Sequence, residues 1–150
     1  MEKIKLESTL SGVAGEYLTA GELSRRGYLA AITLRNAKGV DIIVTNSTAT
    51  KSVAIQVKTR YSKGQAWVLS EKAETYYADN LFYVFVSLNF GEPADFHIVP
   101  SKAVAKTIRE HNQKWLETPG RKGQKHKQTA MRTFYDTESK YKSAWDLLEL

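Results

Sequence analysis

The chain has 150 residues and no cysteine, which excludes disulfide bonds and thiolate metal sites. No apolar run reaches the roughly 18 residues that are needed to cross a bilayer. The first ten residues also lack the apolar stretch of a signal peptide. We therefore expect a cytoplasmic protein that does not contact membranes and is stabilised by packing alone.

The length fits a single domain over residues 1–150, since a chain of this size supports one hydrophobic core. We expect the core at about 10–100, followed at about 101–150 by a helical extension with a basic loop. Lysine and arginine number 22 against 16 acidic residues, which gives a formal net charge of +6. This excess favours a polyanionic partner such as nucleic acid.

The order of the predicted elements is typical of an α/β protein. Apolar residues at helical spacing predict a helix that is capped by Ser8 or Thr9, runs to Arg26 and is closed by Gly27. Ser70 and Ser101 are predicted to cap a short helix and a longer one. Further elements follow from strand composition and apolar spacing: strands at 28–34, 40–45, 53–59, 81–88 and 96–99, helices at 71–78 and 101–116, and a final amphipathic helix with Trp145 and Leu148. Such an order predicts a mixed sheet flanked by helices.

Three polar residues stand out on these strands. Gln56 and Lys58 share one face of the strand predicted at 53–59, because alternate side chains point the same way. Asp41 follows the turn at Gly39 and begins the preceding strand. A symmetric antiparallel hairpin would place Asp41 beside Lys58 and Ile43 beside Gln56. A carboxylate, an amide and an ammonium group are therefore predicted to converge.

Residues 10–100 resemble the PD-(D/E)XK nuclease superfamily, which has the restriction-endonuclease-like fold with an αβββαβ core. The resemblance rests on Gly39-Val40-Asp41 at the second core strand and Gln56-Val57-Lys58 on the third. It includes Glu16 on the first helix. The pattern is most similar to the Holliday-junction-resolvase-like branch and to related uncharacterised branches.

The resemblance implies a divalent-metal-dependent endonuclease that hydrolyses phosphodiester bonds in DNA. It implies Mg²⁺ or Mn²⁺ held by Asp41, the side-chain oxygen of Gln56, the carbonyl of Val57 and Glu16. Lys58 would orient the attacking water or neutralise charge on the phosphate. The expected catalytic residues are thus Asp41, Gln56, Lys58 and Glu16.

Gln56 departs from the commonest family pattern, which has Glu or Asp at this position, although glutamine occurs there in members that retain cleavage. A neutral amide oxygen can bind a hard cation but brings no charge to hold it. A non-catalytic module that binds nucleic acid or protein therefore remains an alternative. A third reading is an α/β domain of unrelated function in which the motif has arisen by chance.

A basic stretch lies between Glu117 and Asp136, with no acid inside it. One interpretation is a loop that binds nucleic-acid phosphates, and the alternative is a solvated linker. Cutting two strands calls for two active sites, so a homodimer is possible. The predicted nucleic-acid-binding residues are Arg121, Lys122, Lys125, Lys127 and Arg132.

Overall fold

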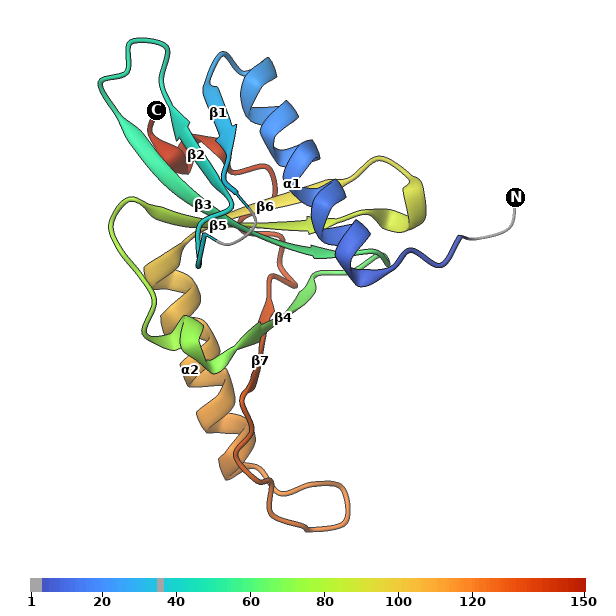
Figure 1. The fold of residues 1–150 in the computed structure, drawn as a ribbon. Coiled ribbons are helices and arrows are strands. Elements are labelled where there is room, and N and C mark those ends of the chain that lie inside the picture. The colour runs from blue at the N-terminus through green and yellow to red at the C-terminus, as the bar shows by residue number, and fades with distance from the viewer. Residues whose placement is uncertain (1–3, 35–36) are drawn as a thin grey trace.

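The computed structural model describes residues 4–34 and 37–150, and it contains a mixed five-stranded sheet with one long helix on each face (Figure 1). The sheet has the strand order β1-β2-β3-β5-β6, and a second, two-stranded sheet consists of β4 and β7. The elements are α1 (Ser8–Arg25), β1 (Leu29–Ile32), β2 (Ile42–Thr45), β3 (Ser52–Arg60), β4 (Ala66–Ser70), η1 (Glu71–Glu74), β5 (Leu81–Ser87), η2 (Asn89–Gly91), β6 (Asp95–Pro100), α2 (Ser101–Glu117), β7 (Met131–Tyr135) and η3 (Trp145–Leu148).

The centre of the large sheet is the parallel pair β3 and β5, and every other neighbouring pair is antiparallel. All seven residues of β5 are buried. A continuous apolar run suits a strand that is covered on both faces, which explains its central position. This confirms the predicted α/β class with a mixed sheet and helices on its faces.

The alternation of side chains along β3 divides the interior into two clusters. Ile55 and Val57 point into the cluster that also contains Leu23 of α1. Tyr83 and Phe85 of β5 point the other way, into a cluster with residues of α2. Gln56 and Lys58 alternate with Ile55 and Val57, so they face the side of the sheet covered by α2.

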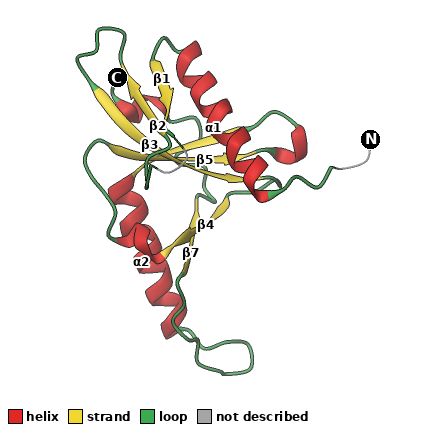
Figure 2. Cartoon of the chain, in the orientation of Figure 1, coloured by secondary structure: helices red, strands yellow, loops and turns green. Residues whose placement is uncertain are grey.

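Strands β4 and β7 pair antiparallel and lie beside α2 in an arm that ends in the loop at 118–130 (Figures 1 and 2). Trp67 and Phe134, which face each other across this ribbon, are buried. The indole Nε1 of Trp67 donates a hydrogen bond to the carbonyl of Val86 at 2.9 Å. The ribbon is thereby attached to β5 of the large sheet.

Two of the predicted helix caps are wrong. Ser8 is already the first residue of α1, and the N-cap is Glu7, without a side-chain hydrogen bond. Ser101 is likewise the first residue of α2, and its hydroxyl donates to the carbonyl of Ala78 at 3.0 Å. That bond satisfies the hydroxyl outside the helix. Ser70, in contrast, accepts from the N–H of Lys72 as predicted.

The predicted C-terminal helices are not seen, apart from α2 itself. Within the described residues after Glu117, the chain forms β7 and the single 3₁₀ turn η3. Trp145 and Leu148 of this turn are buried against the large sheet, so these apolar residues pack on the sheet without forming a regular helix. The helix predicted at 71–78 is also shortened to the turn η1. Across residues 4–34 and 37–150, neither helix combines the length and the apolar character required to span a bilayer.

Candidate active site

Asp41 lies directly before β2, and both its backbone and its side chain bind to β3. The N–H of Asp41 donates to the carbonyl of Ile55 at 2.8 Å. Its carboxylate oxygen Oδ2 accepts a hydrogen bond from the N–H of Val57 at 2.7 Å. The carboxylate is therefore fixed on the middle residue of the Gln56-Val57-Lys58 triplet.

The pairing of β2 with β3 differs by two residues from the predicted register. Ile43 lies opposite Ala54 rather than Gln56. The predicted register needs a longer turn than the one observed. Asn46 closes the observed turn: its backbone N–H donates to the carbonyl of Lys51, and its side-chain oxygen accepts from the N–H of Thr50. An even shift leaves every side chain on its predicted face.

The bond from Val57 to Asp41 lies just outside the paired part of β2, which begins at Ile42. A strand residue directs its N–H and its C=O toward the same neighbour. The Val57 carbonyl therefore points to the same edge as the Asp41 carboxylate. Two oxygen ligands of the kind that Mg²⁺ and Mn²⁺ prefer are thus available at one edge of β3.

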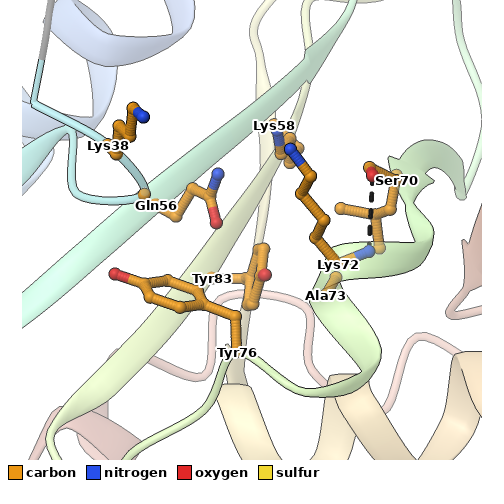
Figure 3. A pocket seen from close by; sticks show the side chains of 10 residues that line it. Lys38, Gln56, Lys58, Ser70, Lys72, Ala73, Tyr76 and Tyr83 are labelled. Atoms are coloured by element: carbon orange, nitrogen blue, oxygen red, sulfur yellow. Dashed lines mark hydrogen bonds between the residues drawn. The ribbon is translucent and has the colours of Figure 1, made fainter.

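A cavity of about 440 Å³ lies over the face of β3 that carries Gln56 and Lys58 (Figure 3). Lys38 and Gly39 of the loop before Asp41 form one wall. The opposite wall is formed by β4, η1 and the residues just after them, and Tyr83 of β5 contributes from the sheet. The lining residues are Lys38, Gly39, Gln56, Lys58, Leu69, Ser70, Lys72, Ala73, Tyr76 and Tyr83.

The cavity has a positive lining. Lys38, Lys58 and Lys72 contribute ammonium groups, and none of the described residues that line it is acidic. Burial raises the pKa of Tyr83 to about 12, with smaller contributions from Tyr76 and Asp41. The Tyr83 phenol therefore keeps its proton at neutral pH and can donate a hydrogen bond. Such a lining suits a phosphate group.

Asp41 is electrostatically coupled to this cavity although it does not line it. Burial raises the pKa of the Asp41 carboxyl above its ordinary value of 3.8, while the hydrogen bond from Val57 and the charge of Lys58 lower it. The net shift is upward. A partly buried carboxylate beside a lysine is a frequent feature of functional sites, because such sites use burial and nearby charges to shift pKa values.

Gly39 connects the loop that carries Asp41 to the opposite wall. Its φ of +75° is a conformation that L side chains rarely adopt, and a Cβ at this position would lie 2.7 Å from the ring of Tyr76. The loop and the segment after η1 are therefore packed against each other with no room for a side chain. This contact holds Lys38 and Tyr76 on the two sides of one cavity.

No protein-family model matches this sequence, and no curated protein matches it either. Solved structures do match. A bacterial homing endonuclease, I-Ssp6803I, superposes with a TM-score of 0.57 and 15% identity, over 95% of this chain and 92% of that one. The chain has a restriction-endonuclease-like fold. The Holliday junction resolvase Hjc of the archaeal hyperthermophile Archaeoglobus fulgidus gives a TM-score of 0.49 and 14% identity, over 84% of both chains.

Within this restriction-endonuclease-like fold, Glu16 lies apart from the cavity lining. It is half-buried on α1, which packs on the opposite face of the sheet. The approach of α1 to β3 is close, since a Cβ on Gly15 would lie 1.8 Å from Oγ1 of Thr59. Glu16 therefore lies near β3, the strand of the Gln56-Val57-Lys58 triplet, but on the helix that packs against the opposite face of the sheet.

The predicted basic residues fall into two groups. Arg121, Lys122, Lys125 and Lys127 are exposed on the loop at the tip of the arm. Arg132 is buried on β7, where its Nε donates to the carboxylate of Glu74 at 2.5 Å. The first group is available to a ligand, whereas Arg132 stabilises the contact between β7 and η1.

The sequence motif did not include two lysines of this cavity, Lys38 and Lys72. Lys72 occupies its position because η1 follows β4, and β4 was not predicted. The signal for Lys72 was the capping serine at position 70, which fixes the direction of the turn. Lys38 belongs to the same glycine turn as Asp41, so its place could have been inferred from Gly39.

Proposed function

We propose that this protein is a divalent-metal-dependent endonuclease that hydrolyses phosphodiester bonds in DNA. The observation that carries the proposal is the 2.7 Å hydrogen bond from the Val57 N–H to the Asp41 carboxylate. It joins an acid to the strand whose flanking residues, Gln56 and Lys58, project into a positively lined cavity (Figure 3). The restriction-endonuclease-like fold, which the homing endonuclease shares, supports the same class of reaction.

The ligands near β3 fit a hard divalent cation. They are the Asp41 carboxylate, the Gln56 amide oxygen and the Val57 carbonyl, with Glu16 as the further ligand that the family resemblance implies. All of them are oxygen atoms, which Mg²⁺ and Mn²⁺ prefer over nitrogen or sulfur. An ion held by these residues would supply Lewis-acid polarisation of the phosphodiester and activation of the attacking water.

The residues of the cavity supply binding and charge. Lys58 in its ammonium form donates to an oxygen of the scissile phosphate, and it offsets the charge that develops as water attacks phosphorus and the bond to the leaving oxygen breaks. Lys38 and Lys72 bind the flanking phosphates from the two walls. Asp41 acts as a ligand in its ionised form, since a carboxylate and not a carboxylic acid binds a hard cation.

A homodimer would place two such sites on the two strands of a duplex, which is why we include it in the proposal. The formal charge of +6 and the exposed cations of the arm favour nucleic acid as the partner. We infer DNA as the substrate class.

A second candidate is a module with the same fold that binds nucleic acid without cutting it. Two observations favour it. Within residues 4–34 and 37–150, no group of three or more His, Asp or Glu side chains is placed to hold a metal ion. The cavity lining also contains lysines without an acid. A binding function needs only these lysines and the arm.

The test is a nicking assay on supercoiled plasmid and on a four-way junction in Mg²⁺, Mn²⁺ or EDTA. Lys58→Ala should reduce cleavage by about 100-fold or more, since it removes charge stabilisation at the phosphate. Lys63→Ala is the matched control, because Lys63 is exposed in the segment between β3 and β4 and changes net charge equally. Cleavage that persists in EDTA, or that survives in Lys58→Ala, contradicts the proposal. Binding without cleavage in any metal supports the second candidate.

A further inference from the structure

The arm carries a second hollow, which we call the aromatic groove. Its volume is about 240 Å³, and it lies between the end of α2 and the strand β7. Large side chains along it are open to solvent: the exposed fractions are 38% for Trp115, 60% for Met131 and 43% for Tyr135. The lining residues are His111, Asn112, Trp115, Thr129, Met131, Arg132, Thr133 and Tyr135.

Two ring pairs organise the groove and its border. The imidazole of His126, from the loop, stacks on the indole of Trp115 with centroids 4.0 Å apart and planes at 23°. His111 packs on Tyr135 at 4.9 Å. The rings of α2 are thus held by rings of the loop and of β7, so they present fixed flat surfaces instead of mobile side chains.

The loop beside these rings is closed by hydrogen bonds. The N–H of Gly120 donates to the carbonyl of Gln124 at 2.8 Å, and that of Gly123 donates to the carbonyl of Gly120 at 2.8 Å. Gln128 accepts from the side chain of Asn112 on α2 at 3.1 Å. These bonds fix the backbone of the loop beside the stack, and the loop carries exposed cations with no acid between Glu117 and Asp136. These cations are Arg121, Lys122, Lys125 and Lys127.

The aromatic groove adjoins the candidate active site through the ribbon β4–β7. Ser70 pairs with Met131, and Leu69 pairs with Arg132. Leu69 and Ser70 line the cavity of the candidate site, whereas Met131 and Arg132 line the groove. A strand of nucleic acid that leaves the cavity along the arm would therefore reach the groove next.

We propose that the aromatic groove binds unpaired bases of a nucleic-acid strand, with the four loop cations on its phosphates. The placement of this strand relative to a cut rests on the proposed function, but the binding itself does not. Flat rings bind any base through its π-face, and neighbouring cations add salt-dependent affinity. The groove would thereby favour substrates with a single-stranded segment over continuous duplex.

Tryptophan fluorescence tests this inference in EDTA, where cleavage by the proposed mechanism is absent. Trp67 and Trp145 are only 2% and 7% exposed, so quenching by an added strand reports mainly on Trp115. The probes are a thymidine oligonucleotide of about 20 nucleotides, the corresponding uridine oligonucleotide, a duplex of equal length and polyglutamate. We expect both single strands to quench, the duplex to quench less, and polyglutamate to leave the emission unchanged.

Trp115→Leu should weaken single-strand binding about 5- to 100-fold, as measured by anisotropy of a labelled oligonucleotide. Tyr17→Leu, which removes an aromatic side chain that is 67% exposed on α1, is the matched control and should bind as the parent does. The double variant Lys125→Gln/Lys127→Gln changes only exposed residues and leaves the ring stack intact. It should lower the salt slope of single-strand binding by about 1.4.

Equal quenching by duplex or by polyglutamate would overturn the inference, as would unchanged affinity in Trp115→Leu. If that variant does not fold, an unchanged salt slope in the double lysine variant has the same consequence. Failure of the nuclease proposal gives a different pattern, in which metal-dependent cleavage is absent but strands still quench Trp115. The two proposals therefore fail separately.

Discussion

The carboxylate of Asp41 accepts a hydrogen bond from the backbone N–H of Val57 at 2.7 Å, just before β2 begins. The same acid thus binds the backbone of β3 and interacts electrostatically with Lys58. Stability and activity can be separated at this residue, because a neutral amide can accept the hydrogen bond but cannot provide the charge.

We expect Asp41→Ala to lower the free energy of unfolding by about 1 to 3 kcal/mol, since it leaves the N–H of Val57 without its acceptor. Asp41→Asn keeps an acceptor oxygen and should cost less than about 1 kcal/mol. Both variants should lose cleavage. Urea denaturation and the nicking assay measure the two properties. Equal stability of the two variants would show that the hydrogen bond contributes little.

Asp41 also predicts a pH dependence of stability. Its pKa is raised in the folded state, so folding binds a proton and the favourable contribution is fully present below pH 3.8, the ordinary pKa. This contribution is lost as pH rises through the raised folded pKa. Asp41→Asn resembles the protonated acid at every pH. The free energy of unfolding of the Asp41→Asn variant, relative to that of the parent, should therefore increase from about pH 3 to pH 7. Urea denaturation at each pH measures it. A difference that is flat or falls with pH would contradict the direction of the shift.

Gln56→Glu should strengthen metal binding. A second carboxylate near Asp41 adds charge to the proposed ligands, and we expect the affinity for Mn²⁺ to rise at least about tenfold. Titration calorimetry measures the affinity, and the Mn²⁺ concentration for half-maximal nicking measures its consequence. Gln124→Glu, which changes the same charge on the exposed arm loop, is the control and should leave both values unchanged. Unchanged affinity in Gln56→Glu would place the metal away from β3.

The contact between α1 and β3 predicts opposite effects for two glycines of one helix. Gly15→Ala should lower the free energy of unfolding by about 2 kcal/mol, because the new Cβ meets Oγ1 of Thr59 at 1.8 Å. Gly12 has no atom within 4 Å of such a Cβ. Gly12→Ala should therefore stabilise the protein by up to about 1 kcal/mol through helix propensity. Thermal denaturation distinguishes the two, and a stable Gly15→Ala protein would show that α1 can move away from the sheet.

The large sheet and the polar face of β3 could be predicted because they depend on local patterns. The apolar run of β5 and the period-two alternation of Gln56 and Lys58 are properties of short segments. The nearness of Asp41 to the triplet followed from a hairpin of short range. The register did not follow, because the side chain of Asn46 sets the length of that turn.

The arm could not be predicted because it depends on distant pairing. Residues 66–70 and 131–135 form a ribbon only when α2 brings them together, and neither segment alternates strongly enough to indicate a strand alone. Ser70 indicated the turn that carries Lys72, but without β4 the place of that turn beside Lys58 could not be inferred. The role of Arg132 was hidden for the same reason, since its partner Glu74 lies on η1.

The parallel pairing of β3 with β5 has a consequence for the order in which the molecule assembles. The hairpin of β2 and β3 closes over a six-residue turn, whereas β5 can join β3 only after the crossover through β4 and η1 has closed. Closing a short loop costs less entropy than closing a long one, so we expect the contact of Asp41 with β3 to form before Lys72 takes its place. The cavity takes Lys72 from this crossover and Tyr83 from β5, so we expect a chain that ends before β5 to lack an enclosed site.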